Sequence, residues 1–189
     1  MSGDNSCFTR PKEAQVYCDW SDPKFRQRCW AYSLIATLSV IGLWGPIFGI
    51  SFDTYFDSVI RSIVLVPCFL VTMAAHEMLH AVFALWVSRA EKVWFQGWHR
   101  GALVVRSSGL VTRSHYVAEL LAPFVIISIV IPALVAVCAP EFGWLATALS
   151  VANAFASSVD FAAAGATLTR SPKGSLVDGD GDELYFVAK

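Results

Sequence analysis

The sequence predicts an all-α integral membrane protein with about four transmembrane helices and a small cytoplasmic β-hairpin-like loop between helices two and three. The composition supports this fold class. Of the 189 residues, 56% are apolar and only 15% are charged, whereas an average soluble domain has about 25% charged residues. The formal net charge is −1, so the chain has no excess of basic residues with which to bind nucleic acid, and we expect no nucleic-acid partner.

Long stretches almost free of charged residues mark the helices. A helix needs about 20 mostly apolar residues to cross the hydrocarbon core of a bilayer, where its backbone must satisfy its own hydrogen bonds. We predict a membrane domain over residues 30–168, flanked by the segments 1–29 and 169–189. Its four spans are expected at about 30–52, 60–88, 118–139 and 142–168, which contain only Arg61, Glu77, Glu119 and Asp160 as charged residues. The first segment is rich in charge and has no apolar run, so we expect no signal peptide.

The distribution of Lys and Arg predicts the orientation. These residues gather in the N-terminal segment, in the loop 89–117 and in the C-terminal tail, so we expect both termini and this loop to face the cytoplasm. The chain would then be a multi-pass protein of the lipid bilayer. Within the loop, Val93–Trp98 and Ala102–Arg106 favour strands, and His99–Gly101 between them favours a hairpin. An exposed strand edge there could capture an extended peptide, or the hairpin could merely cap the helices; the stretch Thr112 to Ser114 could cap the third helix.

Ionisable side chains inside a membrane span are costly and indicate function. Three occur within five residues of the second span, as His76-Glu77-Met78-Leu79-His80. Residues four apart on a helix differ by about 40° around the axis and about 6 Å along it, so both imidazoles can reach one zinc ion (Zn²⁺). Glu77 is rotated away from the two histidines and can act as the general base beside the metal-bound water. The alternative is a polar cluster that joins helices by hydrogen bonds.

A catalytic zinc site needs a third protein ligand. His99 and His115 lie in the polar loop, whereas Asp160 lies near the middle of span four, at the depth of the histidines in span two. We therefore expect Asp160 to be the ligand; the alternative is a protonated Asp or one paired with Ser or Asn. Asn153 and Ser157 share the helical stripe of Asp160, where they could contact the substrate or the developing oxyanion, or form ordinary interhelical hydrogen bonds.

Several motifs occur in one order along the chain. They are His76-Glu77-Met78-Leu79-His80, then Tyr116 with Leu121-Ala122-Pro123-Phe124, then Asn153, Ser157 and Asp160, and finally Pro172–Val177 with Gly181–Tyr185. Together they resemble the putative zincin peptidase family, which belongs to the wider site-2 protease group of intramembrane zinc metalloproteases. The resemblance runs from about residue 60 to 187. It implies zinc on His76, His80 and Asp160, with Glu77 as base and proton shuttle. The larger members usually have a proline in the ligand helix; it is absent between Asn153 and Asp160, which argues against an unwound last helix.

The favoured function is therefore a zinc-dependent endopeptidase that cleaves membrane-embedded or membrane-proximal peptide bonds of membrane proteins or peptides. The alternatives are a protease-like protein that binds membrane clients without cutting them, and a small metal or proton transporter. The sequence leaves the oligomeric state open. The acidic run Asp178–Glu183 lacks the Gly and Glu of a calcium-binding loop, so we expect a solvated turn. The five cysteines are expected to be free thiols.

Overall fold

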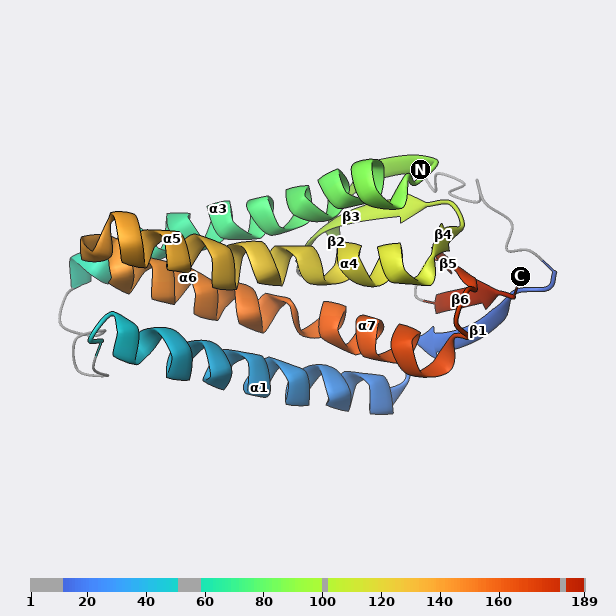
Figure 1. Cartoon of the computed structure of the whole chain (residues 1–189), viewed down its shortest axis with the longest axis horizontal. Coiled ribbons are helices and arrows are strands. Elements are labelled where there is room, and N and C mark those ends of the chain that lie inside the picture. Colours follow the sequence, from blue (N-terminus) through green and yellow to red (C-terminus); the bar gives the residue numbers. More distant parts are fainter. Residues whose placement is uncertain (1–11, 51–58, 100–101, 181–182, 189) are drawn as a thin grey trace.

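The computed structural model describes residues 12–50, 59–99, 102–180 and 183–188, and shows helices lying lengthwise side by side with the strands gathered at one end (Figure 1). The helical segments are α1 (Pro23–Ile47), α3 (Val59–Phe83), α4 (Arg113–Pro123), α5 (Ile131–Cys138), α6 (Gly143–Ala156) and α7 (Ser158–Arg170). Two π-helical segments, η1 (Ala84–Ser88) and η2 (Phe124–Val130), continue α3 and α4, and η3 (Pro140–Phe142) is a 3₁₀ turn. The strands are β1 (Gln15–Asp19), β2 (Lys92–His99), β3 (Ala102–Ser108), β4 (Val111–Thr112), β5 (Leu176–Asp180) and β6 (Glu183–Val187).

Three helical stretches are long and apolar enough to cross a membrane: Pro23–Ile47, Leu65–Ser88 and Arg113–Cys138. The pair α6 and α7 is a fourth candidate if its two halves form one span. The surface of these helices is apolar, since Val71, Trp86 and Val137 are 69%, 81% and 82% exposed. Exposed apolar surface of this kind is typical of helices that face lipid.

The ends of the first and third helices differ from the predicted bounds because local caps set them. α1 begins at Pro23, earlier than expected, since Asp22 caps it by accepting from the Lys24 amide and Pro23 suits the first turn. It ends at Ile47, just after Pro46, rather than at residue 52. Gly49 follows with a positive φ of 63°, a left-handed conformation that does not continue an α-helix. The third begins at Arg113 because Thr112 accepts from the His115 amide, which confirms the predicted cap.

The expectation of one continuous last helix is wrong. α6 and α7 meet at Ser157 with a bend of 50°, although the sequence has no proline there. Ser157 has ψ of 4°, and its hydroxyl donates to the Asn153 carbonyl at 2.9 Å. Such a bond is compatible with a bent helix, and the chain leaves helical backbone angles at Ser157 without a proline.

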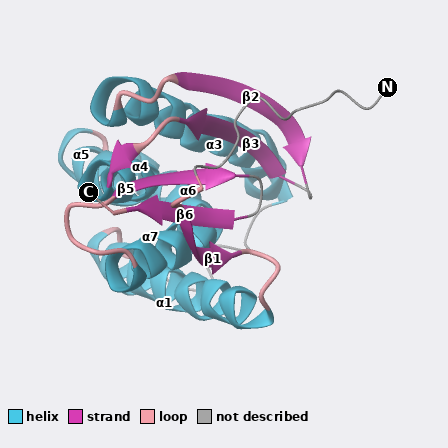
Figure 2. Cartoon of the chain, turned by 90° about the vertical axis from the view of Figure 1, so that its right-hand side faces the viewer, coloured by secondary structure: helices cyan, strands magenta, loops and turns pink. Residues whose placement is uncertain are grey.

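The sheet at the end of the molecule joins the two terminal segments, which the sequence did not predict. Its strand order is β1-β6-β5-β4, and all pairs are antiparallel (Figure 2). Tyr17 and Cys18 of β1 pack against Ala163 of α7, and the Tyr17 hydroxyl bonds the Thr167 hydroxyl at 2.9 Å. Burial raises the pKa of the Cys18 thiol to about 11, which keeps it protonated and unreactive. Cys18, Cys29, Cys68 and Cys138 are free, as expected, and Cys7 lies outside the described residues.

The acidic run Asp178–Glu183 was predicted to be a solvated turn, and this prediction is wrong for Asp178. This side chain is buried, and it accepts from the Gly109 amide and the Tyr185 hydroxyl at 3.1 and 3.2 Å. Desolvation raises the pKa of Asp178 above its ordinary value. The contact ties the tail to the turn after β3, while residues 181–182 of the run lie outside the described parts of the chain.

The predicted hairpin is confirmed as the antiparallel pair β2–β3. It lies beside the C-terminal half of α3, with β3 as the strand in contact with that helix (Figure 2). α4 packs against both α3 and α7, and α6 packs against α1 and α3. These contacts bring residues from spans two and four together behind the hairpin.

Candidate metal centre

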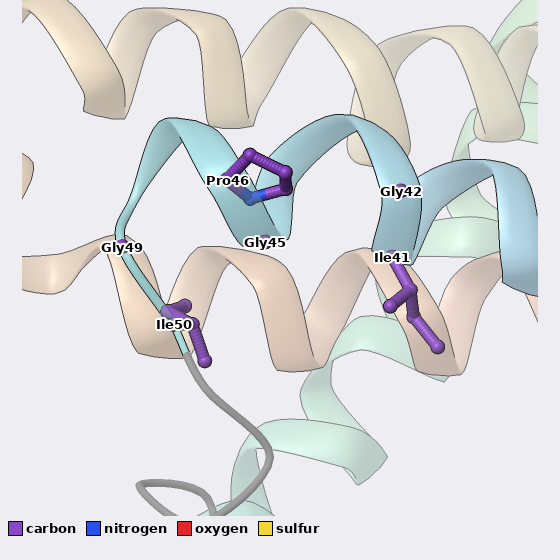
Figure 3. A pocket seen from close by; sticks show the side chains of 6 residues that line it. All are labelled: Ile41, Gly42, Gly45, Pro46, Gly49 and Ile50. Atoms are coloured by element: carbon purple, nitrogen blue, oxygen red, sulfur yellow. The ribbon is translucent and has the colours of Figure 1, made fainter.

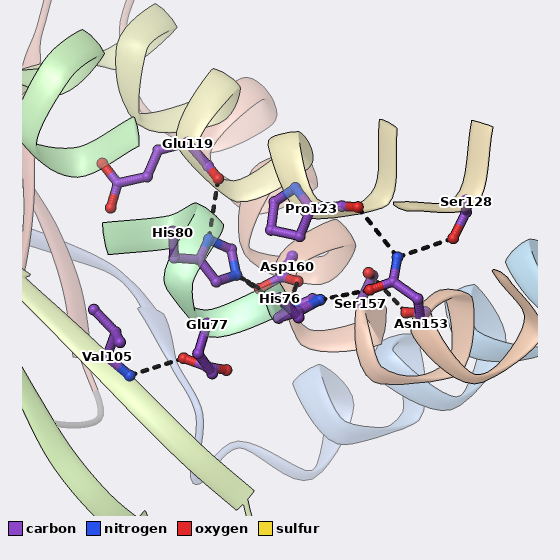
Figure 4. Close-up of polar contacts among 10 residues, drawn as sticks. All are labelled: His76, Glu77, His80, Val105, Glu119, Pro123, Ser128, Asn153, Ser157 and Asp160. Carbon is purple, nitrogen blue, oxygen red and sulfur yellow. Dashed lines mark hydrogen bonds and ion pairs between the residues drawn. The ribbon is translucent and has the colours of Figure 1, made fainter. Parts of the chain in front are cut away.

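Three side chains from two distant helices converge in the interior. His76 and His80 lie on one face of α3, and Asp160 lies in the first turn of α7 (Figure 4). Asp160 Oδ2 is 3.3 Å from His76 Nε2, and Asp160 Oδ1 is 3.5 Å from His80 Nε2. The three ligand atoms all lie within 4.8 Å of one another. The structure thus brings together the residues that the sequence predicted as metal ligands.

Hydrogen bonds on the far side of each ring place a proton on Nδ1. His76 Nδ1 lies 2.8 Å from Asn153 Oδ1, and His80 Nδ1 lies 3.0 Å from the Glu119 carbonyl oxygen. A carbonyl only accepts, so His80 donates from Nδ1. Asn153 uses its amide nitrogen to donate to the Pro123 carbonyl, so its oxygen accepts from His76. Each ring therefore directs Nε2, and not Nδ1, towards Asp160 and the other ring, which is the side from which it would bind a metal.

The donor set fits a zinc ion. The two Nε2 atoms lie 3.1 Å apart, which is hydrogen-bond distance, and a metal ion bound by both rings would take the place of the proton between them. Asp160 Oδ2 is buried, and among the described residues its polar neighbour is His76 Nε2 at 3.3 Å, so a buried carboxylate here needs a cation, either a metal ion or a protonated imidazole. Two imidazoles and a carboxylate with one open position are typical of catalytic zinc.

The break between α6 and α7 positions Asp160. Because α7 begins at Ser158, Asp160 lies in its first turn, where the helix dipole stabilises a negative charge. Ser157 is fully buried, and its hydroxyl donates to the Asn153 carbonyl. Asn153 is also fully buried, and its amide nitrogen donates to Pro123 and to the Ser128 hydroxyl at 2.9 Å. In this structure Asn153 orients the candidate ligand His76 and Ser157 lies at the break; a contact of either with substrate stays a prediction.

Glu77 lies beside the three ligands but is directed towards the hairpin. Its Oε2 accepts from the backbone amide of Val105 in β3 at 2.8 Å (Figure 4). Glu77 follows His76 on α3 and is not one of the three grouped side chains, but it lies close to them. A general base needs such a position. His115 is exposed in α4 and is not part of the group. The side chain of His99 lies outside the described parts of the chain.

Sequence reasoning did not single out Glu119. This residue lies at the beginning of the third span and is 6% exposed. Its carbonyl orients His80, and its carboxyl group accepts from the hydroxyls of Ser88 and Ser107. The available signal was an ionisable residue inside a predicted span. The amide of Val105 was also not foreseen, because a backbone group has no sequence signature.

An open apolar groove of about 480 Å³ lies at the far end of α1. It is lined by Ile41, Gly42, Gly45, Pro46, Gly49 and Ile50 (Figure 3). None of these side chains is ionisable or a metal ligand, and the groove is separate from the centre formed by α3 and α7.

The fold and the site define a mostly helical protein with a group of side chains that could hold a metal ion. The family model of the putative zincin peptidases matches residues 69–176, which is more than half of the chain and includes His76, His80 and Asp160. The chain therefore belongs to the putative zincin peptidase family. The match ends before residue 177, so the last part of the resemblance seen in the tail lies beyond it. No curated protein and no solved structure matches the chain.

Proposed function

We propose that the protein is an intramembrane zinc endopeptidase of the site-2 protease type. The observation that carries the proposal is the convergence of His76 Nε2, His80 Nε2 and the Asp160 carboxylate within helices apolar enough to cross a membrane. Membership of the putative zincin peptidase family supports metallopeptidase chemistry. The intact Glu77 beside the ligands supports an enzyme over a client-binding protein, because binding alone needs no base.

In this proposal each residue has one task. Bound zinc would polarise the scissile carbonyl and lower the pKa of the attacking water. Glu77 takes the proton from that water and gives it to the leaving amine. Asn153 and the Glu119 carbonyl hold the two imidazoles so that both Nε2 atoms point to the metal.

The substrate class follows from the hairpin. β3 pairs with β2 along one edge, and among the described residues it has no strand partner along the other. The Val105 amide points from that outer edge to Glu77. An extended segment of a membrane protein could pair with this edge and lie beside the base and the metal. A helical substrate would have to unwind first, since a helix hides its scissile carbonyls.

Cleavage of a single-span membrane peptide by purified protein in lipid nanodiscs tests the proposal. We expect wild-type protein to yield two products, identified by mass spectrometry, and Glu77→Gln to yield none while it keeps its fold. Glu91→Gln is the matched control, since Glu91 is exposed at the start of the hairpin. The Glu91→Gln protein should cleave the peptide at the wild-type rate. Cleavage by Glu77→Gln at the wild-type rate would overturn the assignment of the base.

A further inference from the structure

Glu119 is a buried carboxyl group whose position the proposed reaction leaves unexplained. It lies in α4 and is only 6% exposed, although burial of a carboxyl group costs free energy that apolar packing would avoid. Among the described residues, its hydrogen-bond donors are two serine hydroxyls from different elements. Ser88 at the end of η1 donates to Oε2 at 2.7 Å, and Ser107 of β3 donates to Oε1 at 3.1 Å.

The two serines place Glu119 between the helix of the metal ligands and the hairpin. Ser88 belongs to the π-helical continuation of α3, which carries His76 and His80. Ser107 is two residues from Val105, so the two side chains share one face of β3. The same stretch of β3 is therefore attached to α3 through the Val105 amide and to α4 through Glu119.

The backbone of Glu119 takes part in the same arrangement, because its carbonyl accepts from His80 Nδ1 at 3.0 Å. One residue thus contacts a candidate ligand through its backbone and the hairpin through its side chain. We propose that Glu119 is a positioning residue that fixes the outer edge of β3 over Glu77, through hydrogen bonds to Ser107 and Ser88. The proposal rests on the proposed peptidase function for its consequence, since that edge is where an extended substrate would bind.

Two variants of Glu119 can show whether its side chain acts by bridging Ser88 and Ser107 through hydrogen bonds or by its negative charge. A glutamine can accept from one serine and donate to the other, because each hydroxyl both donates and accepts. We therefore expect Glu119→Gln to keep the bridge. Glu119→Ala removes both contacts, and Ser107→Ala removes only the contact to β3.

Amide hydrogen exchange in detergent-purified protein tests the positioning without any substrate. In Glu119→Ala and Ser107→Ala, the peptides covering 102–108 should exchange about 10- to 100-fold faster than in wild type, since a lost buried hydrogen bond lowers the cost of local opening. In Glu119→Gln and in the control Glu141→Ala, which changes an exposed carboxyl group, exchange should match wild type. If Glu119→Ala does not fold, Ser107→Ala decides. Wild-type exchange over 102–108 in a folded Ser107→Ala protein would overturn the proposal.

Kinetics provide the second readout. Glu119→Ala should raise KM for a strand-forming peptide about tenfold and leave kcat and the bound zinc unchanged, with Glu119→Gln restoring KM. A fall in zinc content and kcat together would show a merely structural role and overturn the proposal. If wild-type protein cleaves nothing, the proposed function fails, while the exchange result still decides whether Glu119 positions β3.

Discussion

Replacement of Asn153 by alanine tests how the metal ligands are oriented. The Asn153 side chain is fully buried and makes three hydrogen bonds, to His76 Nδ1 at 2.8 Å, to the Pro123 carbonyl at 3.2 Å and to the Ser128 hydroxyl at 2.9 Å. Alanine leaves the His76 Nδ1–H without an acceptor. His76 can then move its proton to Nε2, which removes a ligand atom from the site.

The expected loss follows from those contacts. Removal of the partner that orients a ligating histidine costs about 10- to 100-fold in metal affinity. The buried groups left unpaired destabilise the fold by about 1–3 kcal/mol each. Both effects are measurable on detergent-purified protein, by competition for zinc with a chromophoric chelator and by thermal unfolding.

A matched control separates orientation from packing. Thr147 lies on the same helix α6 and is also buried, and among the described residues its hydroxyl donates to the Gly143 carbonyl one turn back. Thr147→Ala should therefore leave zinc affinity unchanged. A folded Asn153→Ala protein with wild-type zinc affinity would refute the reasoning, because His76 would not then need Asn153 to fix its tautomer.

Two further predictions concern the ends of the helix bundle. Burial raises the pKa of Asp178 above its unfolded value of about 3.9. The folded state therefore holds the proton more tightly, and its stability rises as the pH falls from the folded pKa towards about 4. The melting temperature of wild type relative to Asp178→Asn should increase over that range, and a decrease would contradict the burial argument. Gly143→Ala would place a Cβ 2.1 Å from the Phe48 ring, so we expect about 1–3 kcal/mol of destabilisation from overpacking; an unchanged denaturation midpoint would contradict this.

The sequence predicted those parts of the fold and site that depend on local patterns. The spacing of His76 and His80 on one turn, the apolar spans and the strand-prone hairpin all follow from residues close together in the chain. Asp160 was predicted by its depth in the fourth span, and the structure brings it to the histidines.

The missed features depend on contacts between distant segments. The pairing of β1 with β6 joins residues near the two ends of the chain, and neither strand has a pattern that names its partner. The bend at Ser157, where ψ is 4°, has no proline or glycine to mark it in the sequence. Glu119 becomes significant only when Ser88 and Ser107 lie around it, and both come from other elements.

The measurement that tests the central claim most directly is the zinc content of the detergent-purified protein, determined by mass spectrometry for wild type, His76→Ala, Asp160→Ala and Glu77→Gln. The account predicts about one zinc per chain in wild type and in Glu77→Gln, and loss of zinc in the two ligand variants, because three protein ligands hold a catalytic zinc and the base is not one of them. A wild-type protein that binds no zinc after reconstitution would contradict the account, as would an Asp160→Ala protein that keeps it.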